Sequence, residues 1–149
     1  MSEYLEYTVD KFTFKVATDR VYNPEGVWAK ANGAQVTVGV SDFCQQHNGD
    51  VAFVEVKEAG TAVSINDEFA AIETIKVDIE LPCPVSGKIT AVNEKLEMEA
   101  EIIIQDPYGD GWLAVIEAAD WTADQARLLT PAAYLELMKI QVQTEAENG

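Results

Sequence analysis

The sequence predicts a mainly β fold, a small barrel or sandwich, with helices at its C-terminal end. Short segments rich in apolar residues are separated by turn sequences such as Asn-Gly, which is the spacing of an all-β domain. Helical spacing of apolar residues becomes prominent only near the C-terminus, so no βαβ pattern is present. The 149 residues, 48% hydrophobic and 24% charged, suffice for one domain with its own core.

The first strands are predicted from alternation and turn chemistry. Residues 8–16 alternate apolar and polar side chains, so we expect one strand there. Residues 23–26 read Asn-Pro-Glu-Gly, a turn sequence. Strands are expected at 27–30 and 35–40, joined by a hairpin through Asn32 and the glycine after it, because this pair tolerates positive φ angles.

The middle of the chain contains a short helix, a strand and an internal repeat. Residues 41–49 begin with a Ser or Asp N-cap and end in Asn-Gly, typical of a short helix. Residues 51–56 are almost wholly apolar and predict a buried strand. The segments 60–69 and 87–96 superpose residue by residue, each running from a glycine to an Asn-acid turn. An approximate two-fold and chance similarity between short β segments are both open interpretations.

The last third adds one strand and two helices. A strand is predicted at 112–117, and a short helix at 122–129 with Thr122 as its cap. A second helix opens at Pro131, where the missing N–H does no harm. Its apolar face is Tyr134, Leu135, Met138 and Val142. We expect an acidic, disordered tail at 144–149.

The charge balance limits the possible partners. Twenty-six acidic and ten basic side chains give a net charge of −16, which repels nucleic acid and anionic membranes and favours basic protein surfaces or simple solvation. No signal peptide and no apolar segment long enough to span a bilayer is present. Two cysteines, Cys44 and Cys83, and one histidine, His47, make neither a zinc site nor a disulfide framework. We therefore expect a cytoplasmic protein with reduced thiols, no metal and no membrane association.

The usual catalytic motifs are missing. The sequence has no G-x-S-x-G, P-loop or G-x-G-x-x-G pattern. Cys44 and His47 share a helix face at a spacing of i, i+3, with Asp42 or Asp50 available to orient the imidazole, but such pairs are usually incidental. The sequence predicts that this protein is not an enzyme.

Lys76 lies between the two repeat segments. One interpretation is an ordinary exposed lysine, paired with Glu73 or Asp78. The other is a site of acylation, because a lysine on the hairpin that joins two halves of a β platform would be open to another enzyme's active site. Periodicity alone favours the first interpretation, and the position between the repeats favours the second.

Five motifs, in order along most of the chain, resemble the glycine cleavage H-protein family and its lipoyl-bearing relatives. The family's lipoylation motif E-[ST]-[VI]-K is matched at Glu73 to Lys76. The other four are Gly39-Val40-Ser41-Asp42 with Gln45 and Gly49-Asp50, Phe53-Val54-Glu55, Pro84-Val85-Ser86-Gly87 with Val92-Asn93, and Asp106-Pro107-Tyr108-Gly109-Asp110-Gly111-Trp112. The M-K-M tripeptide of biotin carriers is absent, which favours lipoyl over biotinyl.

This resemblance implies a barrel-sandwich hybrid of the lipoyl/biotinyl type. Lipoic acid would be attached covalently to Lys76. Ile75 and Val77, on either side, would hold the backbone of this lysine in the sheet. Glu73 would assist the lipoylating enzyme, and His47 would lie near a groove for the arm or simply on the surface. The further partners implied are the glycine cleavage enzymes and dihydrolipoamide dehydrogenase.

Departures from the family pattern favour a specialised branch. The family's H-E-W-V reads Gly-Val-Trp-Ala here, so Val27 replaces a glutamate that helps to hold the loaded arm. Cys83 lies close to the lipoyl segment and Cys44 replaces an alanine, and both are candidates for sulfur or disulfide exchange. The pattern is similar to the lipoate-binding proteins of bacterial sulfur oxidation, which serve a heterodisulfide-reductase-like complex. Burial in a β core is the alternative role for each cysteine.

The sequence thus leaves three functions open. The favoured one is a lipoyl carrier in sulfur oxidation, the second is the H protein of glycine cleavage that carries an aminomethyl group, and the third is an unmodified acidic adaptor. We expect a monomer with three parts: an N-terminal extension at 1–20, a carrier domain at 21–143 and the tail at 144–149.

Overall fold

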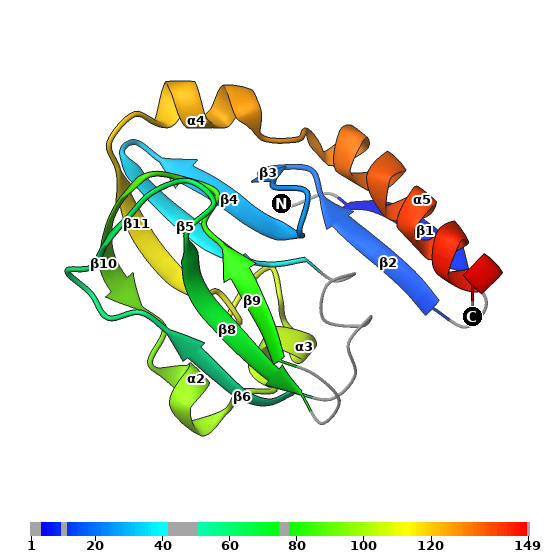
Figure 1. Cartoon of the computed structure of the whole chain (residues 1–149), viewed down its shortest axis with the longest axis horizontal. Helices are drawn as coiled ribbons and strands as arrows, with labels where there is room; N and C mark the ends of the chain where they lie inside the picture. Colours follow the sequence, from blue (N-terminus) through cyan, green and yellow to red (C-terminus); the bar gives the residue numbers. More distant parts are fainter. Residues whose placement is uncertain (1–3, 10–11, 42–50, 75–77, 149) are drawn as a thin grey trace.

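The computed structural model describes residues 4–9, 12–41, 51–74 and 78–148, and within these ranges the fold is mainly β with a helical C-terminus. Figure 1 shows two sheets facing each other and a helical arm beside them. The predicted fold class is confirmed, including the C-terminal helices. The short helix predicted at 41–49 falls almost wholly outside the described residues.

The larger sheet has six strands in the order β3-β4-β5-β11-β10-β7. Its strands are Val21–Tyr22, Val27–Asn32, Gln35–Val40, Ala114–Ala118, Gly87–Val92 and Ala62–Val63, respectively. The hairpin predicted between β4 and β5 is confirmed, with Gly33 at a φ of 65°. The two repeat segments meet where β7 pairs antiparallel with β10, which an approximate two-fold requires, although β7 is only two residues long.

The smaller sheet has three antiparallel strands in the order β6-β8-β9. They are Val51–Val56, Glu68–Thr74 and Asp78–Pro82. The main core fills the space between the two sheets, because the inward side chains of both belong to one buried apolar cluster that includes Val38, Ile116, Ile72 and Leu81. This packing fixes the small sheet on the large one, as in a β-sandwich.

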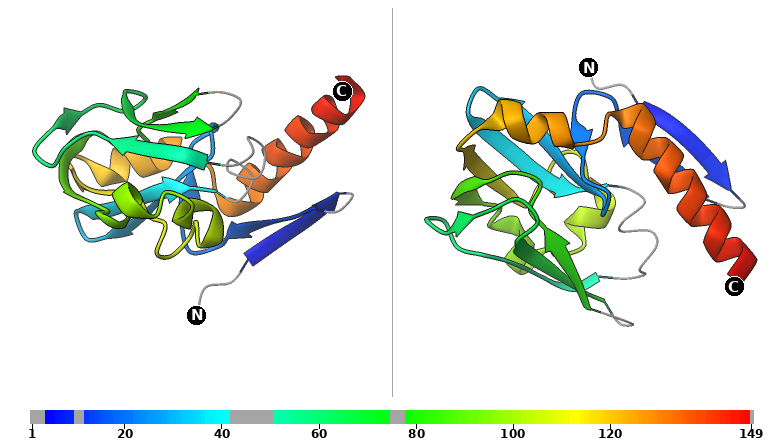
Figure 2. Two further views of the ribbon diagram at one scale, coloured as in Figure 1. Left: turned by 90° about the horizontal axis from the view of Figure 1, so that it is seen from below. Right: turned by 45° about the horizontal axis from the view of Figure 1, so that its top comes forward.

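A second, smaller core joins the N- and C-terminal segments. Strands β1 (Tyr4–Val9) and β2 (Phe12–Ala17) pair as a hairpin, and helix α5 (Pro131–Asn148) packs against both of them. Figure 2 shows this arm projecting from the sandwich. Its buried residues are Phe14, Val16, Tyr22, Trp28, Tyr134, Leu135 and Met138.

Two predictions for these terminal segments differ from the structure. The single strand expected at 8–16 is a hairpin of two strands, since alternation continues on both sides of the turn and does not reveal it. The tail expected to be disordered from residue 144 continues helix α5 to Asn148. Glu145, Ala146 and Glu147 have high helix propensity, which favours continuation of the helix.

The remaining helices are short. They are α2 (Lys95–Met98), α3 (Ile102–Gln105) and α4 (Trp121–Arg127). The cap of α4 is Asp120, which accepts from the Ala123 amide at 3.2 Å, rather than the predicted Thr122. At α5 the expected start is confirmed, with the Thr130 hydroxyl accepting from the Ala133 amide. No helix in the described part of the chain is long and apolar enough to cross a membrane.

Two residues of the family motifs, Asn93 and Gly111, have structural roles in the sandwich. The Asn93 side chain is buried and donates to the carbonyls of Asp110 and Trp112 at 2.7 and 2.8 Å. Gly111 leaves no room for a side chain, because a Cβ there would lie 2.6 Å from the Ile102 carbonyl oxygen. These contacts pin the loop before β11 to the end of β10.

Candidate functional site

The candidate site is the pair of strands that flank Lys76. Strand β8 ends at Thr74, strand β9 begins at Asp78, and the register places Glu73 opposite Asp78. Only residues 74–77 therefore connect the two paired strands along the chain. Ile75, Lys76 and Val77 lie outside the described residues, so their expected roles stay predictions.

The strands that lead to this connection are anchored in the core. Ile72 and Thr74 of β8 are buried, while Ala71 and Glu73, which alternate with them, lie on the outer face. Strand β8 is the central strand of its sheet and pairs with β6 on one side and β9 on the other. Both flanks of the Lys76 segment are thus held by sheet pairing and, on β8, by burial of every second side chain.

The outer face beside this connection is acidic. Glu73 and Asp78 are exposed and directly opposite each other, and Phe53 of β6 is paired with Glu73 on its other side. Like charges facing each other across strands destabilise a sheet by roughly 0.2–1 kcal/mol. An acidic side chain on each side of Lys76 is consistent with recognition by another protein, as predicted for Glu73, and also with the ion pair to Lys76 that is the alternative interpretation.

Phe53 is the residue whose environment the sequence analysis predicted wrongly. Residues 51–56 read as a buried strand, yet β6 lies at the edge of its sheet and Phe53 is 50% exposed. Val54 alone in this strand is fully buried. A β-bulge between Val51 and Phe53 shifts the register there. The apolar composition of the strand gave no signal of this exposed aromatic side chain.

The segment 42–50, with Cys44 and His47, is outside the described residues, but its two ends are placed. Ser41 is buried, and its hydroxyl is 2.7 Å from the hydroxyl of Tyr134. At the other end, Val51 pairs with Thr74. Strand β6 therefore begins next to Thr74, the first residue of the connection that contains Lys76. The expected roles of Cys44 and His47 remain predictions.

Cys83 is a core residue, which favours burial in the β core, one of its two expected roles, over sulfur exchange with the arm. Its side chain is completely buried and its thiol donates to the Val85 carbonyl at 3.0 Å. Burial is the main cause that raises the pKa of this thiol to about 12. Exchange requires an accessible thiolate, and this thiol is neither accessible nor ionised near neutral pH.

We expect Cys83 to resist alkylation in the folded protein. In a Cys44→Ser background, iodoacetamide at pH 8 should leave the native chain unmodified for hours and modify Cys83 within minutes in urea, which intact mass measures directly. Because the folded pKa lies above the ordinary value of 9.0, its contribution to stability is complete below pH 9 and is lost as the pH rises toward 12. Rapid native alkylation would restore Cys83 as a redox candidate.

Val27, which replaces the family's glutamate, and the neighbouring Trp28 are both buried. Val27 belongs to the main core, and the Trp28 indole N–H lies 3.0 Å from the carbonyls of both Val40 and Pro107. Arg20 stacks over the same ring at 4.5 Å. The tryptophan therefore has a structural role, and valine at 27 contributes packing where an acid would contribute charge.

Two packed sheets, one of which includes a hairpin with Lys76 in its connection, define a small β-sandwich domain. Residues 20–141 match the family model for the glycine cleavage H-protein. The chain belongs to the glycine cleavage H-protein family, whose members carry a lipoyl group on a lysine and act as carriers rather than catalysts.

The relatives agree with this assignment. The glycine cleavage system H proteins of Symbiobacterium thermophilum and Bacillus cytotoxicus are 41% and 38% identical, over 80% and 78% of this chain and 92% and 91% of theirs. A crystal structure of the H protein from Mycobacterium marinum superposes with a TM-score of 0.70 at 28% identity, covering 78% of this chain and 94% of the other. These relatives favour the glycine cleavage alternative over the sulfur-oxidation branch, for which they provide no support.

Proposed function

We propose that this protein is the lipoyl carrier of a glycine cleavage system, with the lipoyl group attached to Lys76. The observation that supports this most directly is the register of β8 and β9, which leaves a connection of only four residues with Lys76 among them. The family membership supplies the chemistry of the attached group.

The described residues fit such an attachment. Strands β8 and β9 hold the two ends of the connection, and the acidic side chains of Glu73 and Asp78 face outward beside it. When attached, the lipoyl group supplies a dithiol that accepts and releases the transferred group. The protein's part is to hold the attachment point stiffly, since tethering keeps a reactive arm at millimolar effective concentration near a docked active site.

The sulfur-oxidation function is supported less well, because one of its two cysteines is buried. It rested on Cys83 and Cys44 near the arm and on the replacement of the family's glutamate by Val27. Burial removes Cys83 from exchange chemistry, and Cys44 is not described. The replacement at Val27 still distinguishes this chain from the family pattern. In a glycine cleavage system, the partners of this protein would be the lipoylating enzyme, the glycine cleavage enzymes and dihydrolipoamide dehydrogenase.

Two measurements test this proposal. The chain is co-expressed with a lipoylating enzyme, and intact mass with peptide mapping should show one lipoyl group on Lys76. The lipoylated protein should then support glycine-dependent CO₂ release with the glycine cleavage enzymes of its host. A chain that is never lipoylated contradicts the carrier function. A lipoylated chain that supports no CO₂ release contradicts the glycine cleavage assignment and returns the sulfur branch to first place.

A further inference from the structure

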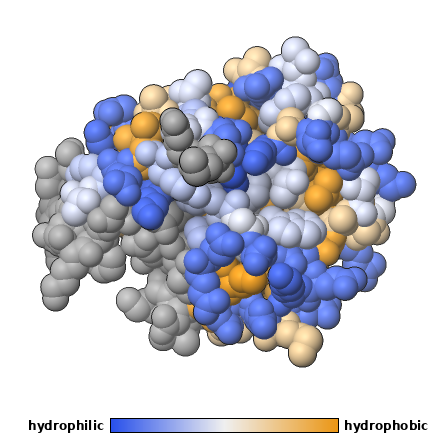
Figure 3. All heavy atoms as spheres, turned by 180° about the vertical axis from the view of Figure 1, so that it is seen from behind, coloured by the Kyte–Doolittle hydropathy of each residue, from blue (hydrophilic) through white to orange (hydrophobic). Residues whose placement is uncertain are grey.

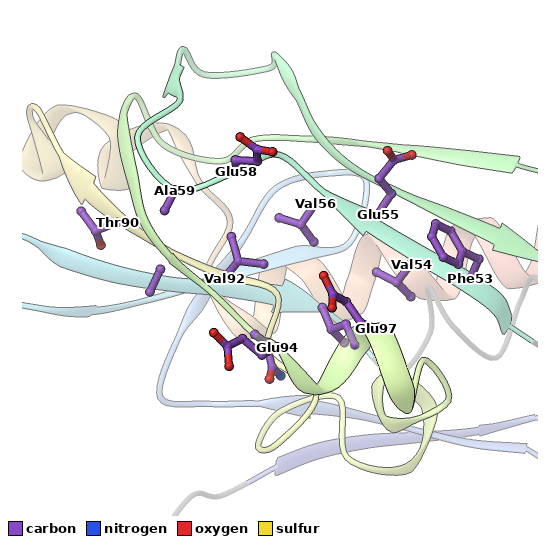
Figure 4. A pocket seen from close by; sticks show the side chains of 13 residues that line it. Phe53, Val54, Glu55, Val56, Glu58, Ala59, Thr90, Val92, Glu94 and Glu97 are labelled. Carbon is purple, nitrogen blue, oxygen red and sulfur yellow. The ribbon is translucent and has the colours of Figure 1, made fainter.

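A groove opens at the surface over one side of the main core. It is bounded by strand β6, strand β10 and helix α2, and its volume is about 670 Å³. Its floor is apolar, with Val54 and Leu96 buried and Val56 and Val92 partly buried. Figure 4 shows Val56 and Val92 facing each other across it. No sequence pattern indicates this groove, because its two walls come from different sheets.

The rim of this groove is acidic on both sides. Glu55 and Glu58 come from β6 and the chain that follows it, and Glu94 and Glu97 come from the opposite wall, as Figure 4 shows. All four are exposed, and none of their carboxylates has an ion-pair or hydrogen-bond partner among the described residues. The basic residue nearest in sequence to Glu94, Lys95, pairs instead with Asp110 at 3.8 Å.

The composition of this groove contrasts with the surface around it. Figure 3 shows one face of the molecule, seen from behind, on which hydrophilic residues surround small apolar patches. The groove combines an apolar floor with negative charge on both sides that has no partner among the described residues. A ligand that matches it has apolar surface flanked by positive charges.

The groove also continues to the candidate site. Phe53, half exposed, forms the end of the groove, and the same residue pairs with Glu73 in the sheet. A molecule that fills the groove therefore lies beside β6, the strand that pairs with β8, and β8 leads to Lys76. Aromatic residues of this kind, exposed at the end of an apolar hollow, are enriched at the centres of protein interfaces.

We propose that this groove is a docking site for a basic segment of a partner enzyme, one with at least two Lys or Arg side chains around an apolar side chain. The proposal rests on the carrier function, since the partner is an enzyme that acts on the arm at Lys76. The net charge of −16 disfavours nucleic acid and anionic membranes as occupants. Within the described residues, no cluster of His, Cys, Asp and Glu could hold a metal ion instead.

Charge reversal on both walls tests this proposal. The double variant Glu58→Lys/Glu97→Lys is compared with Glu6→Lys/Glu25→Lys, which changes the net charge equally at exposed positions outside the groove. Only lipoylated protein, verified by mass, enters the assay, so a failure of lipoylation counts against the carrier function alone. Glycine-dependent CO₂ release is measured with each partner enzyme made limiting in turn.

For at least one partner, the groove variant should raise the KM for the carrier about tenfold at low ionic strength, with kcat within about twofold. The increase should shrink to about twofold or less near 0.5 M salt, because screening removes the electrostatic contribution. Phe53→Ser should raise the same KM at both salt concentrations. The proposal is overturned if the groove variant raises KM no more than the control variant for every partner, or lowers kcat alone.

Discussion

Lys76→Arg is expected to eliminate glycine-dependent CO₂ release supported by this protein, a loss of at least about a hundredfold. Arginine retains the positive charge and the long side chain but has no primary amine that a lipoylating enzyme could acylate. The backbone pairing of Glu73 with Asp78 does not depend on whether lysine or arginine occupies position 76. The variant should therefore fold normally. Activity of the purified variant, assayed with the glycine cleavage enzymes, measures the effect.

Lys88→Arg is the matched control for this substitution. Lys88 is an exposed lysine on strand β10, outside the connection between β8 and β9. It should accept no lipoyl group, and its arginine variant should keep full activity. A Lys76→Arg protein that retains more than a few per cent of the activity would place the arm on another lysine.

Gly87→Ala is expected to lower the free energy of unfolding by about 3 kcal/mol, the largest effect of any single methyl group we foresee in this protein. A Cβ at Gly87 would collide with the backbone carbonyl oxygen of Glu117 and lie 3.1 Å from the Ala118 Cα. Because the collision is with backbone, β10 would have to move away from β11. Urea unfolding followed by tryptophan fluorescence measures the loss.

Gly33→Asn is the control that separates this collision from the general cost of replacing a glycine. Gly33 lies in the β4–β5 turn at a φ of 65° with open space around it, and asparagine tolerates that conformation. It should cost less than about 1 kcal/mol. If Gly87→Ala costs no more than Gly33→Asn, then β10 and β11 do not approach each other as closely as the structure has them.

Local chemistry in the sequence was enough to predict much of this fold. The β4–β5 hairpin follows from the Asn-Gly pair, and the start of α5 follows from Thr130 and Pro131. These features depend on backbone conformations that particular residues favour within a few positions of the chain. The motif around Lys76 pointed to the candidate site through the family resemblance, and lipoyl attachment there stays a prediction.

Packing between segments far apart in the sequence accounts for what could not be predicted. By sequence, Cys83 is a possible redox group, but the chain after β9 places it in the core. By sequence, Phe53 is a buried strand residue, but β6 is an edge strand with a bulge, and Phe53 is exposed there. The acidic groove exists only because β6 and β10, from different sheets, come together beside α2. Composition and periodicity report how polar each residue is, whereas burial depends on which strands become neighbours, and that is settled by the packing of the two sheets.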